Sequence, residues 1–383
     1  MKNSRLIIKI SCNGATNAAK DHSNPLISRY LPDKSNIWQN CEFYLNDDKI
    51  READYWFIVG DINCDEEACL INKNNIIFMT GEPESIRRYD NSCEFINQFA
   101  RIYTSQLNVK HKNVFPCRPP INWWVDAGHP IKTQEEFNNL SQNTLGYNDF
   151  QSTKFYEKTK LISVFCSAKI FTAGHKIRYN FCKKLKNHFK DKLDWYGAGV
   201  NPIENKWDGI APYKYHITLE NSSSPNYWTE KLMDPLMVLT YPIYYGAVNI
   251  DEYFNDKQIT TIDIKYPKTA IAKIENLINN NVYEKSEQHL LDARKLVMDK
   301  YNFFNIICEI VNSDKEKNIA KTLVKIKQEK FFLHNFDKPF VKSRTGIFKR
   351  LKKSVSKKID KFRNIVIDYV LLIKFKLNLL GLI

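Results

Sequence analysis

Several patterns typical of metal and redox sites are missing from this 383-residue sequence. It holds no Asp-x-Asp pair, a common arrangement for holding a divalent cation, and no Cys-x-x-Cys pair. The eight histidines lack the spacing of zinc ligands, which disfavours a structural zinc site. The nine cysteines are odd in number. We therefore expect reduced, mostly buried thiols rather than a disulfide framework.

The start of the chain also lacks a membrane-targeting pattern. The apolar run Leu6–Ile10 is too short for the core of a signal peptide or for a membrane span, and polar residues flank it. We interpret it as a first strand. Together with the cysteine usage, this predicts a cytoplasmic protein.

Positive charge is concentrated at one end of the chain. The formal net charge is +14, and residues 341–383 hold 12 Lys or Arg against 2 Asp, which accounts for +10 of it. The first 340 residues are therefore close to neutral. A basic tail of this kind can contact a membrane, a nucleic acid or phosphate ligands.

Two similar patterns of alternating strands and helices follow one another along the chain. In each, short apolar runs end at Gly or at polar residues and are separated by segments with helical periodicity, which is typical of parallel α/β sheets. Predicted strands cover residues 5–11, 54–59, 76–80, 100–104, 161–165, 193–196, 215–219, 242–245 and 259–264. Predicted helices cover residues 92–98, 176–189, from about 229, 269–279 and 286–301.

The polar stretch 131–157, rich in Asn, Gln and Thr, predicts a boundary between two domains. We expect an α/β fold of two Rossmann-like domains, 1–150 and 151–335, that face a cleft, followed by a tail, 336–383. Ligands of such folds bind at the carboxyl ends of the strands.

The segment from Tyr213 to Asn249 carries the clearest site pattern. A buried strand ends at Glu220-Asn221, and a polar loop leads to a helix that opens near Thr229. Free N–H groups and the positive dipole end of a helix suit a phosphate, and Lys231 adds a full charge. Glu230 can accept two hydrogen bonds from a ribose diol, and Tyr227 offers a flat face and a hydroxyl. An ordinary capped helix would look the same from spacing alone.

Three blocks in this segment resemble a family signature. Glu-Asn-Ser at 220–222, Tyr-Trp-Thr-Glu-Lys at 227–231 and Pro-Ile-Tyr-Tyr-Gly-Ala at 242–247 are similar, in order and spacing, to those of the α-1,3/1,4-fucosyltransferases, glycosyltransferase family 10. That resemblance implies a transferase of two facing Rossmann-like domains (GT-B) with GDP-fucose as donor and a glycan as acceptor.

The resemblance also implies which residues bind the donor. In the family the Tyr, Glu and Lys of the middle block bind GDP-fucose, and an Arg early in the preceding helix contacts its diphosphate. By position the donor-binding residues are Tyr227, Glu230, Lys231, Arg178, Glu220 and Asn221. The chain departs from the pattern at Trp228, where a small aliphatic residue is usual, and at Pro235, which should kink the helix.

A second, shorter resemblance implies a catalytic base. Phe-Met-Thr-Gly-Glu-Pro-Glu-Ser at 78–85 is similar to a family segment whose first Glu is the presumed general base, which maps to Glu82. Inverting transfer to a sugar hydroxyl needs one carboxylate to take the proton. Glu84, two residues on, is the alternative.

The remaining site predictions concern the cation and the acceptor. Lys231, Arg178 and a helix terminus can neutralise a diphosphate, so we expect no metal and no other cofactor. Trp123 and Trp124 could stack on an acceptor sugar or could equally be core residues. Asn13 is a further possible acceptor contact.

The tail predicts a peripheral membrane anchor. From Ile347 to Ile373 apolar residues recur every three or four positions, and lysines and arginines occupy the rest, as in a basic amphipathic helix. We expect it to lie on an anionic membrane at the inner face; a solvated helix or a disordered tail is the alternative, and nucleic-acid binding is disfavoured.

Two other functions fit the same sequence. One is a non-catalytic glycan- or nucleotide-binding protein on this fold, and the other is a transferase of a different nucleotide sugar. The expected context, synthesis of a surface polysaccharide or a lipid-linked glycan, follows from the tail.

Overall fold

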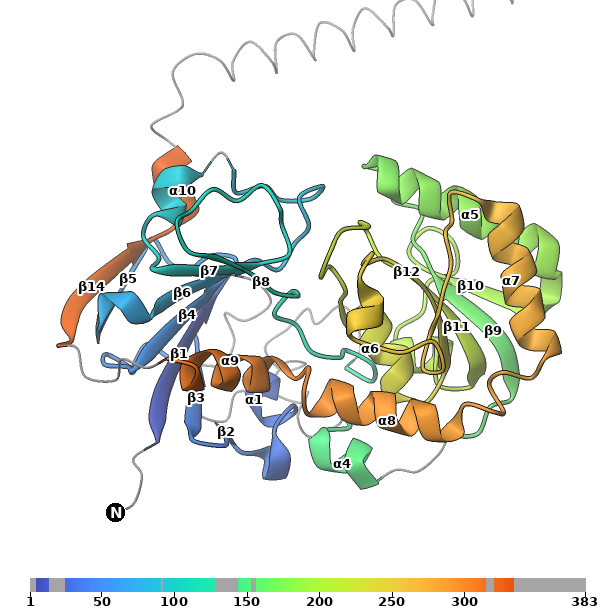
Figure 1. Cartoon of the computed structure of the whole chain (residues 1–383), viewed down its shortest axis with the longest axis horizontal. Coiled ribbons are helices and arrows are strands. Elements are labelled where there is room, and N and C mark those ends of the chain that lie inside the picture. The colour runs from blue at the N-terminus through green and yellow to red at the C-terminus, as the bar shows by residue number, and fades with distance from the viewer. Residues whose placement is uncertain are drawn as a thin grey trace, which may run out of the picture. The chain divides into compact units, whose positions relative to one another are not determined.

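The computed structural model describes residues 5–13, 25–90, 92–127, 144–152, 156–314 and 320–333. Residues Met1–Glu329 form one compact unit. This unit contains two separate, mainly parallel sheets, a seven-stranded one in the first half of the chain and a five-stranded one in the second (Figure 1). The fold class predicted from the sequence, α/β with two Rossmann-like halves, is confirmed.

The first sheet has the order β2-β3-β1-β4-β6-β7-β8. All its neighbours are parallel except β2 and β3. Its central strands β4 and β6 are apolar on both faces, as buried parallel strands usually are. The strands are β1 (Leu6–Cys12), β2 (Ile37–Trp38), β3 (Cys41–Leu45), β4 (Tyr55–Val59), β6 (Ile76–Met79), β7 (Arg101–Thr104) and β8 (Val114–Pro116).

The second sheet is parallel throughout, in the order β10-β9-β11-β12-β13. Its central strand β11 is almost wholly buried. The strands are β9 (Lys160–Phe165), β10 (Leu193–Tyr196), β11 (Tyr213–Leu219), β12 (Tyr241–Tyr245) and β13 (Thr260–Thr261). The predicted strand 259–264 therefore shrinks to two residues.

The main helices are α5 (Ala173–Phe189), α6 (Glu230–Met237), α7 (Pro267–Asn279), α8 (Glu287–Met298) and α9 (Phe303–Asn312). Helices α5, α6, α7 and α8 follow the predicted ranges closely, whereas α9 was not predicted. Helices α5 and α7 run side by side along the second sheet (Figure 1). Shorter helices are α1 (Pro25–Ser28), α2 (Cys93–Ile96), α4 (Tyr147–Ser152) and α10 (Glu329–Leu333).

After the second sheet the chain returns to the first half. Helix α9 contacts β2, where the Trp38 indole donates to Asn305 Oδ1 at 2.9 Å. Strand β14 (Thr322–Lys327) then pairs antiparallel with β5 (Glu66–Ile71). The sequence did not predict this return. The limits of the three predicted segments remain predictions.

Three further observations bear on the sequence predictions. All nine cysteines are free thiols. Among the described residues, no group of three or more His, Cys, Asp and Glu side chains is placed to hold a metal ion. None of the described helices combines the length and apolarity that crossing a bilayer requires. The predicted tail, 336–383, lies outside the described residues.

Candidate active site

A cavity of about 710 Å³ lies at the carboxyl ends of strands from both sheets. This is where ligands bind in folds of this class. Its wall combines loops of the first half with helix α6 and the segments before it. The lining includes Asn13, Gly60, Glu82, Arg87, Tyr89 and Trp124 from the first half, and Lys206, Asn221, Tyr227, Thr229, Glu230 and Lys231 from the second.

Glu82 reaches this cavity from the loop that follows β6. Its side chain is exposed there, and no hydrogen bond or ion pair to another described residue holds its carboxylate. The surrounding walls partly desolvate it, which raises its pKa; Glu230 adds to the rise and Lys231 opposes it. A free carboxylate with a raised pKa suits proton transfer.

Glu84 has a different environment, although it is only two residues away. Its Oε1 accepts hydrogen bonds from the main-chain N–H groups of Leu107 at 2.8 Å and Asn108 at 3.2 Å. The carboxylate thus anchors the loop after β7. Of the two candidate bases, the structure leaves Glu82 free to face the cavity.

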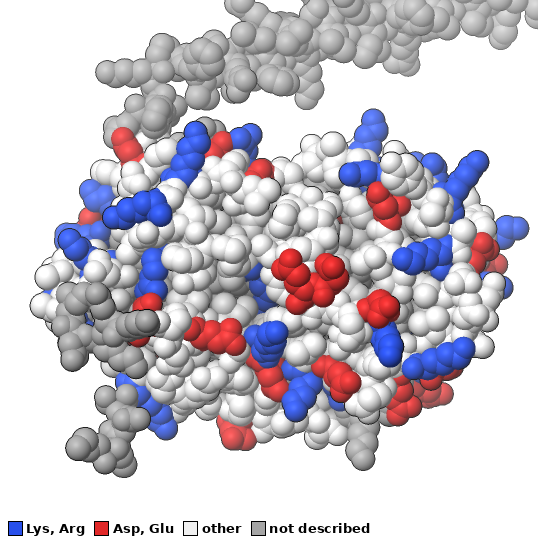
Figure 2. Space-filling view, viewed as in Figure 1, with Lys and Arg blue, Asp and Glu red and all other residues white. Residues whose placement is uncertain are grey.

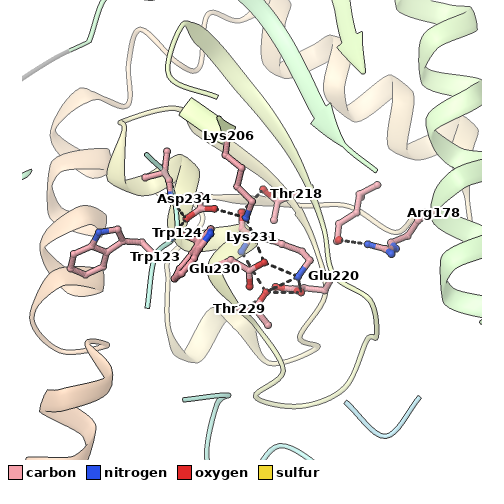
Figure 3. Close-up of polar contacts among 12 residues, drawn as sticks. Trp123, Trp124, Arg178, Lys206, Thr218, Glu220, Thr229, Glu230, Lys231 and Asp234 are labelled. Atoms are coloured by element: carbon pink, nitrogen blue, oxygen red, sulfur yellow. Dashed lines mark hydrogen bonds and ion pairs between the residues drawn. The ribbon is translucent and has the colours of Figure 1, made fainter. Parts of the chain in front are cut away.

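Helix α6 begins at the cavity wall, with Thr229 as its N-cap. The Thr229 hydroxyl accepts from the Lys231 N–H and from Lys231 Nζ at 3.1 Å, and it donates to Glu220 (Figure 3). The Lys231 ammonium also lies 3.2 Å from Glu230 Oε1 and 3.6 Å from Glu220 Oε2. Burial alone would lower the pKa of Lys231, but these two carboxylates raise it. The site therefore holds a permanent cation at a helix N-terminus.

Glu220 supports this helix and is not part of the described cavity wall. It is fully buried at the end of β11, and its carboxylate accepts from the Thr229 N–H at 2.7 Å. Glu220 was predicted to contact the donor directly. In the structure its carboxylate lies behind Thr229 and supports that residue. Asn221, the next residue, does line the cavity.

Glu230 lies between two lysines on the cavity wall. Its Oε1 is 3.2 Å from Lys231 Nζ and 3.6 Å from Lys206 Nζ. Burial would raise the pKa of Glu230, but the two ammonium groups lower it to about 2. Glu230 is therefore an ionised acceptor at any physiological pH. Tyr227, in the loop before the helix, also lines the cavity, and burial raises the pKa of its phenol.

Arg178 is buried near the site, not solvated as an ordinary helix arginine would be. Its Nη1 donates to the Leu219 carbonyl at 2.9 Å, at the end of β11 (Figure 3). Its Nε has no hydrogen-bond partner among the described residues. Arg178 is not among the residues that line the cavity, so a contact with a diphosphate remains a prediction.

The two adjacent tryptophans take different places. Trp123 is 0% exposed and packs edge-on against Tyr30 at 4.9 Å, so the structure contradicts its predicted acceptor contact. Trp124 lines the cavity. Asn13 lines it as well, beside Gly60, whose φ of 74° favours glycine.

Residues that sequence reasoning missed connect these parts. Asp234 in α6 accepts hydrogen bonds from the main-chain N–H groups of Trp124 and Val125 and pairs with Lys206 at 2.9 Å. Arg87, on the other wall, pairs with Glu329 at 2.6 Å. Single polar residues outside a motif carry no sequence signal, since only the fold brings them together.

The two departures from the family pattern have structural explanations. Trp228 is buried, with the Arg118 guanidinium 4.8 Å from its ring and three aromatic rings around it. Helix α6 runs through Pro235 and ends at Met237. Proline has no N–H for the Lys231 carbonyl four residues earlier, and the Thr218 hydroxyl donates to that carbonyl at 3.4 Å.

Comparisons with known proteins find similarity to fucosyltransferases. Residues 155–329 match the family model described as "Glycosyltransferase family 10 (fucosyltransferase) C-term". Alpha-(1,3)-fucosyltransferase B of Drosophila melanogaster is 30% identical over 101 residues, which cover 26% of this chain and 23% of that protein. GDP-fucose protein O-fucosyltransferase 3 of Homo sapiens is 31% identical over 91 residues, covering 22% of this chain and 19% of that protein.

Each alignment thus spans less than a quarter of these relatives' own length. A crystal structure of an alpha1,3-fucosyltransferase aligns over 84% of this chain and 92% of that one, with 17% identity and a TM-score of 0.46. The family match includes all three sequence blocks between residues 220 and 247, and α6 with the second-half wall of the cavity. Residues 155–329 of this chain are thus similar to glycosyltransferase family 10, the fucosyltransferases.

Proposed function

We propose that this protein transfers L-fucose from GDP-β-L-fucose to a hydroxyl group of a glycan, with inversion and in α-1,3 or α-1,4 linkage. One observation carries the proposal. The free carboxylate of Glu82, from the first sheet, and the Tyr227, Glu230 and Lys231 side chains, from the family-matched half, line the same cavity. A base and an anion-binding helix terminus are the two groups that such a transfer needs.

The donor fits the second wall of the cavity. The N-terminus of α6 and the Lys231 ammonium offer a diphosphate N–H donors and positive charge. Glu230, ionised between two lysines, is a suitable acceptor for ribose hydroxyl groups. The name of the human relative includes GDP-fucose, which supports this nucleotide sugar over others.

The chemistry assigns each charge to a residue. The acceptor hydroxyl gives its proton to Glu82 while its oxygen attacks the anomeric carbon of fucose from the face opposite the phosphate. The bond between that carbon and the phosphate oxygen breaks, and GDP leaves with the electron pair. Lys231 and the helix terminus stabilise the charge that develops on the leaving phosphate. Because attack and departure occur on opposite faces, the configuration inverts.

We also propose that the reaction needs no metal ion. The sequence has no Asp-x-Asp pair, and the Lys231 ammonium on the cavity wall can neutralise the charge of a diphosphate. Arg178, which is buried in α5 and donates to the last carbonyl of β11, adds a second cation nearby. Activity is expected to persist in EDTA; loss of activity that Mn²⁺ or Mg²⁺ restores would contradict this part.

A panel of nucleotide sugars with a library of glycan acceptors tests the function directly. The expected result is transfer from GDP-fucose only, with the linkage and anomeric configuration read by NMR of the product. Faster transfer from another nucleotide sugar would replace the donor assignment. Binding of GDP without any transfer would favour a non-catalytic binding protein.

The setting of the reaction is a further part of the proposal. The basic tail of residues 336–383 supports a peripheral position on the inner face of an anionic membrane, in the cytoplasm. A lipid-linked or membrane-proximal glycan, as in surface polysaccharide synthesis, would then be the acceptor.

A further inference from the structure

Lys206 has an ion pair that does not depend on any ligand. It opens the short 3₁₀ helix Lys206–Gly209 between β10 and β11, and its side chain is 20% exposed at the cavity. Its ammonium lies 2.9 Å from Asp234 Oδ2 and 3.6 Å from Glu230 Oε1. One lysine thus joins a buried carboxylate to a carboxylate on the cavity wall.

Asp234 is fixed from the opposite side. It is 1% exposed, and its Oδ1 accepts from the Trp124 N–H at 2.5 Å and from the Val125 N–H at 2.8 Å. A buried carboxylate without its cation is costly, so Asp234 keeps Lys206 in place. The ammonium position is therefore set by main-chain groups of the first half.

Lys231 is a less constant partner for Glu230. Its ammonium is shared among Glu230, Glu220 and the Thr229 hydroxyl, and under the proposed function it turns to the donor phosphates. When it does, Lys206 is the cation that stays beside Glu230. Without Lys206, the Glu230 carboxylate would have no second ion pair among the described residues to hold its orientation.

We propose that Lys206, held by Asp234, is a positioning residue that orients the Glu230 carboxylate toward the ribose hydroxyls of the donor. This inference rests on the proposed function and deepens it. It makes recognition of the ribose depend on a residue that does not bind the ribose.

Calorimetry with GDP and with 2′,3′-dideoxy-GDP separates positioning from direct phosphate binding. Both nucleotides keep the base and the phosphates, but the second lacks the ribose hydroxyls. In Lys206→Met, GDP affinity should fall about tenfold, the loss typical of a charge-assisted hydrogen bond. The affinity for the dideoxy analogue should stay unchanged, because it makes no hydrogen bond to Glu230.

Matched variants complete the test. Lys206→Arg keeps the charge and should restore most of the GDP affinity. Lys214→Met removes a lysine whose ion pair with Glu284 lies on the exposed surface, and it should leave both affinities unchanged. The loss from Lys206→Met should nearly vanish in a Glu230→Gln background, since the two residues act through one contact.

Stability needs its own variant, because Lys206→Met leaves Asp234 buried without a cation. The double variant K206M/D234N removes both charges and should fold while still losing GDP affinity. Equal losses for GDP and the dideoxy analogue would overturn the proposal, since Lys206 would then bind phosphate. Unchanged GDP affinity in the folded double variant would overturn it too. Failure of the wild type to bind GDP would instead refute the proposed function.

Discussion

Glu82 and Glu84 share one loop, yet their surroundings differ in the property that a base needs. Glu82 is free at the cavity and Glu84 is bound to two main-chain N–H groups. We expect Glu82→Gln to retain GDP binding but to lower kcat by about 10²–10⁴, the range for loss of a general base. Glu84→Gln is the matched control and should keep most of the activity. An inactive Glu84→Gln beside an active Glu82→Gln would move the base by two residues.

Lys231 and Arg178 should both contribute to nucleotide binding, but by different routes. Lys231 faces the cavity, so its replacement by Ala should weaken GDP binding by about 1.5–3 kcal/mol. Arg178→Ala should also weaken it, since it removes a cation close to Lys231 and frees the end of β11. Calorimetry on folded variants measures both; unchanged GDP affinity would make the residue purely structural.

Lys158 should make the free energy of unfolding increase as the pH rises above neutral. Its ammonium donates to the Ala211 and Val238 carbonyls and the Thr240 hydroxyl, and burial lowers its pKa to about 7. An unfolded chain keeps the ordinary lysine pKa of about 10.4. Between these values the unfolded state binds one more proton, so the free energy of unfolding increases with pH, by at most about 1.4 kcal/mol per pH unit.

Urea unfolding at pH 7 and pH 9 checks this linkage. Lys158→Met has no proton to bind at this position and should lack that increase. From pH 7 to pH 9, the free energy of unfolding of the wild type should therefore rise relative to that of Lys158→Met. Parallel pH profiles would show that Lys158 keeps its charge in the folded state.

Single residues of the site were predictable where the family signature named them. Glu82, Asn221, Tyr227, Glu230 and Lys231 all line the cavity. Sequence reasoning left Trp123 open between the core and an acceptor contact and expected Glu220 at the donor, because a motif does not reveal which of two neighbours is buried. It missed Lys206 and Asp234, whose significance comes from contacts across 28 to 110 residues of chain.

At the scale of elements, helix α6 depends on the Thr229 hydroxyl more than its length suggests. That hydroxyl caps the helix, meets Lys231 and donates to the buried Glu220. We expect Thr229→Ala to lower the free energy of unfolding by about 0.5–2 kcal/mol, as N-cap losses do, and to weaken GDP binding as Lys231 loses its support. Thr229→Ser keeps the hydroxyl and should behave like the wild type in thermal unfolding and calorimetry. Equal stability of Ala and Ser variants would exclude the capping role.

Elements were predictable where they are buried on both faces. Apolar or aromatic residues predominate in β1, β4, β6, β9 and β11, and each strand was placed within two residues. Strand β3 was missed because its five residues alternate in burial, and β14 because lysines interrupt its apolar residues. Pairing partners far along the chain define both strands, and a local pattern does not contain them.

At the scale of the whole molecule, the tail differs from the rest of the chain in its net charge. On the face drawn in Figure 2, basic and acidic side chains of the described residues are interspersed, in keeping with a net charge of about +4 for the first 340 residues. The tail holds the remaining +10. We expect the chain cut after Lys342 to stay folded and active but no longer to co-sediment with anionic liposomes. Binding by the full chain should weaken as salt rises, because salt screens the attraction between exposed charges beyond a distance of about 8–10 Å.

A cut before β14 is the contrasting control. Removing residues from 320 onward takes away the partner of β5 and the Glu329 carboxylate that pairs with Arg87, so this variant should unfold at lower temperature. If the cut after Lys342 also unfolds the protein, the tail belongs to the fold. A full chain that ignores anionic vesicles at low salt would refute the membrane position.

The return of the chain after the second sheet has a consequence for how the protein is made. Strand β5 leaves the ribosome about 250 residues before its partner β14. Strand β2 likewise emerges about as far ahead of α9, which contacts it. The first half therefore stays incomplete during translation, and Phe43 lacks the Phe304 ring of α9 that packs against it. The second sheet has all its strands by residue 261 and can fold earlier. The two halves should thus fold against the usual order, and the amino-terminal half should be completed only when the last described strand emerges.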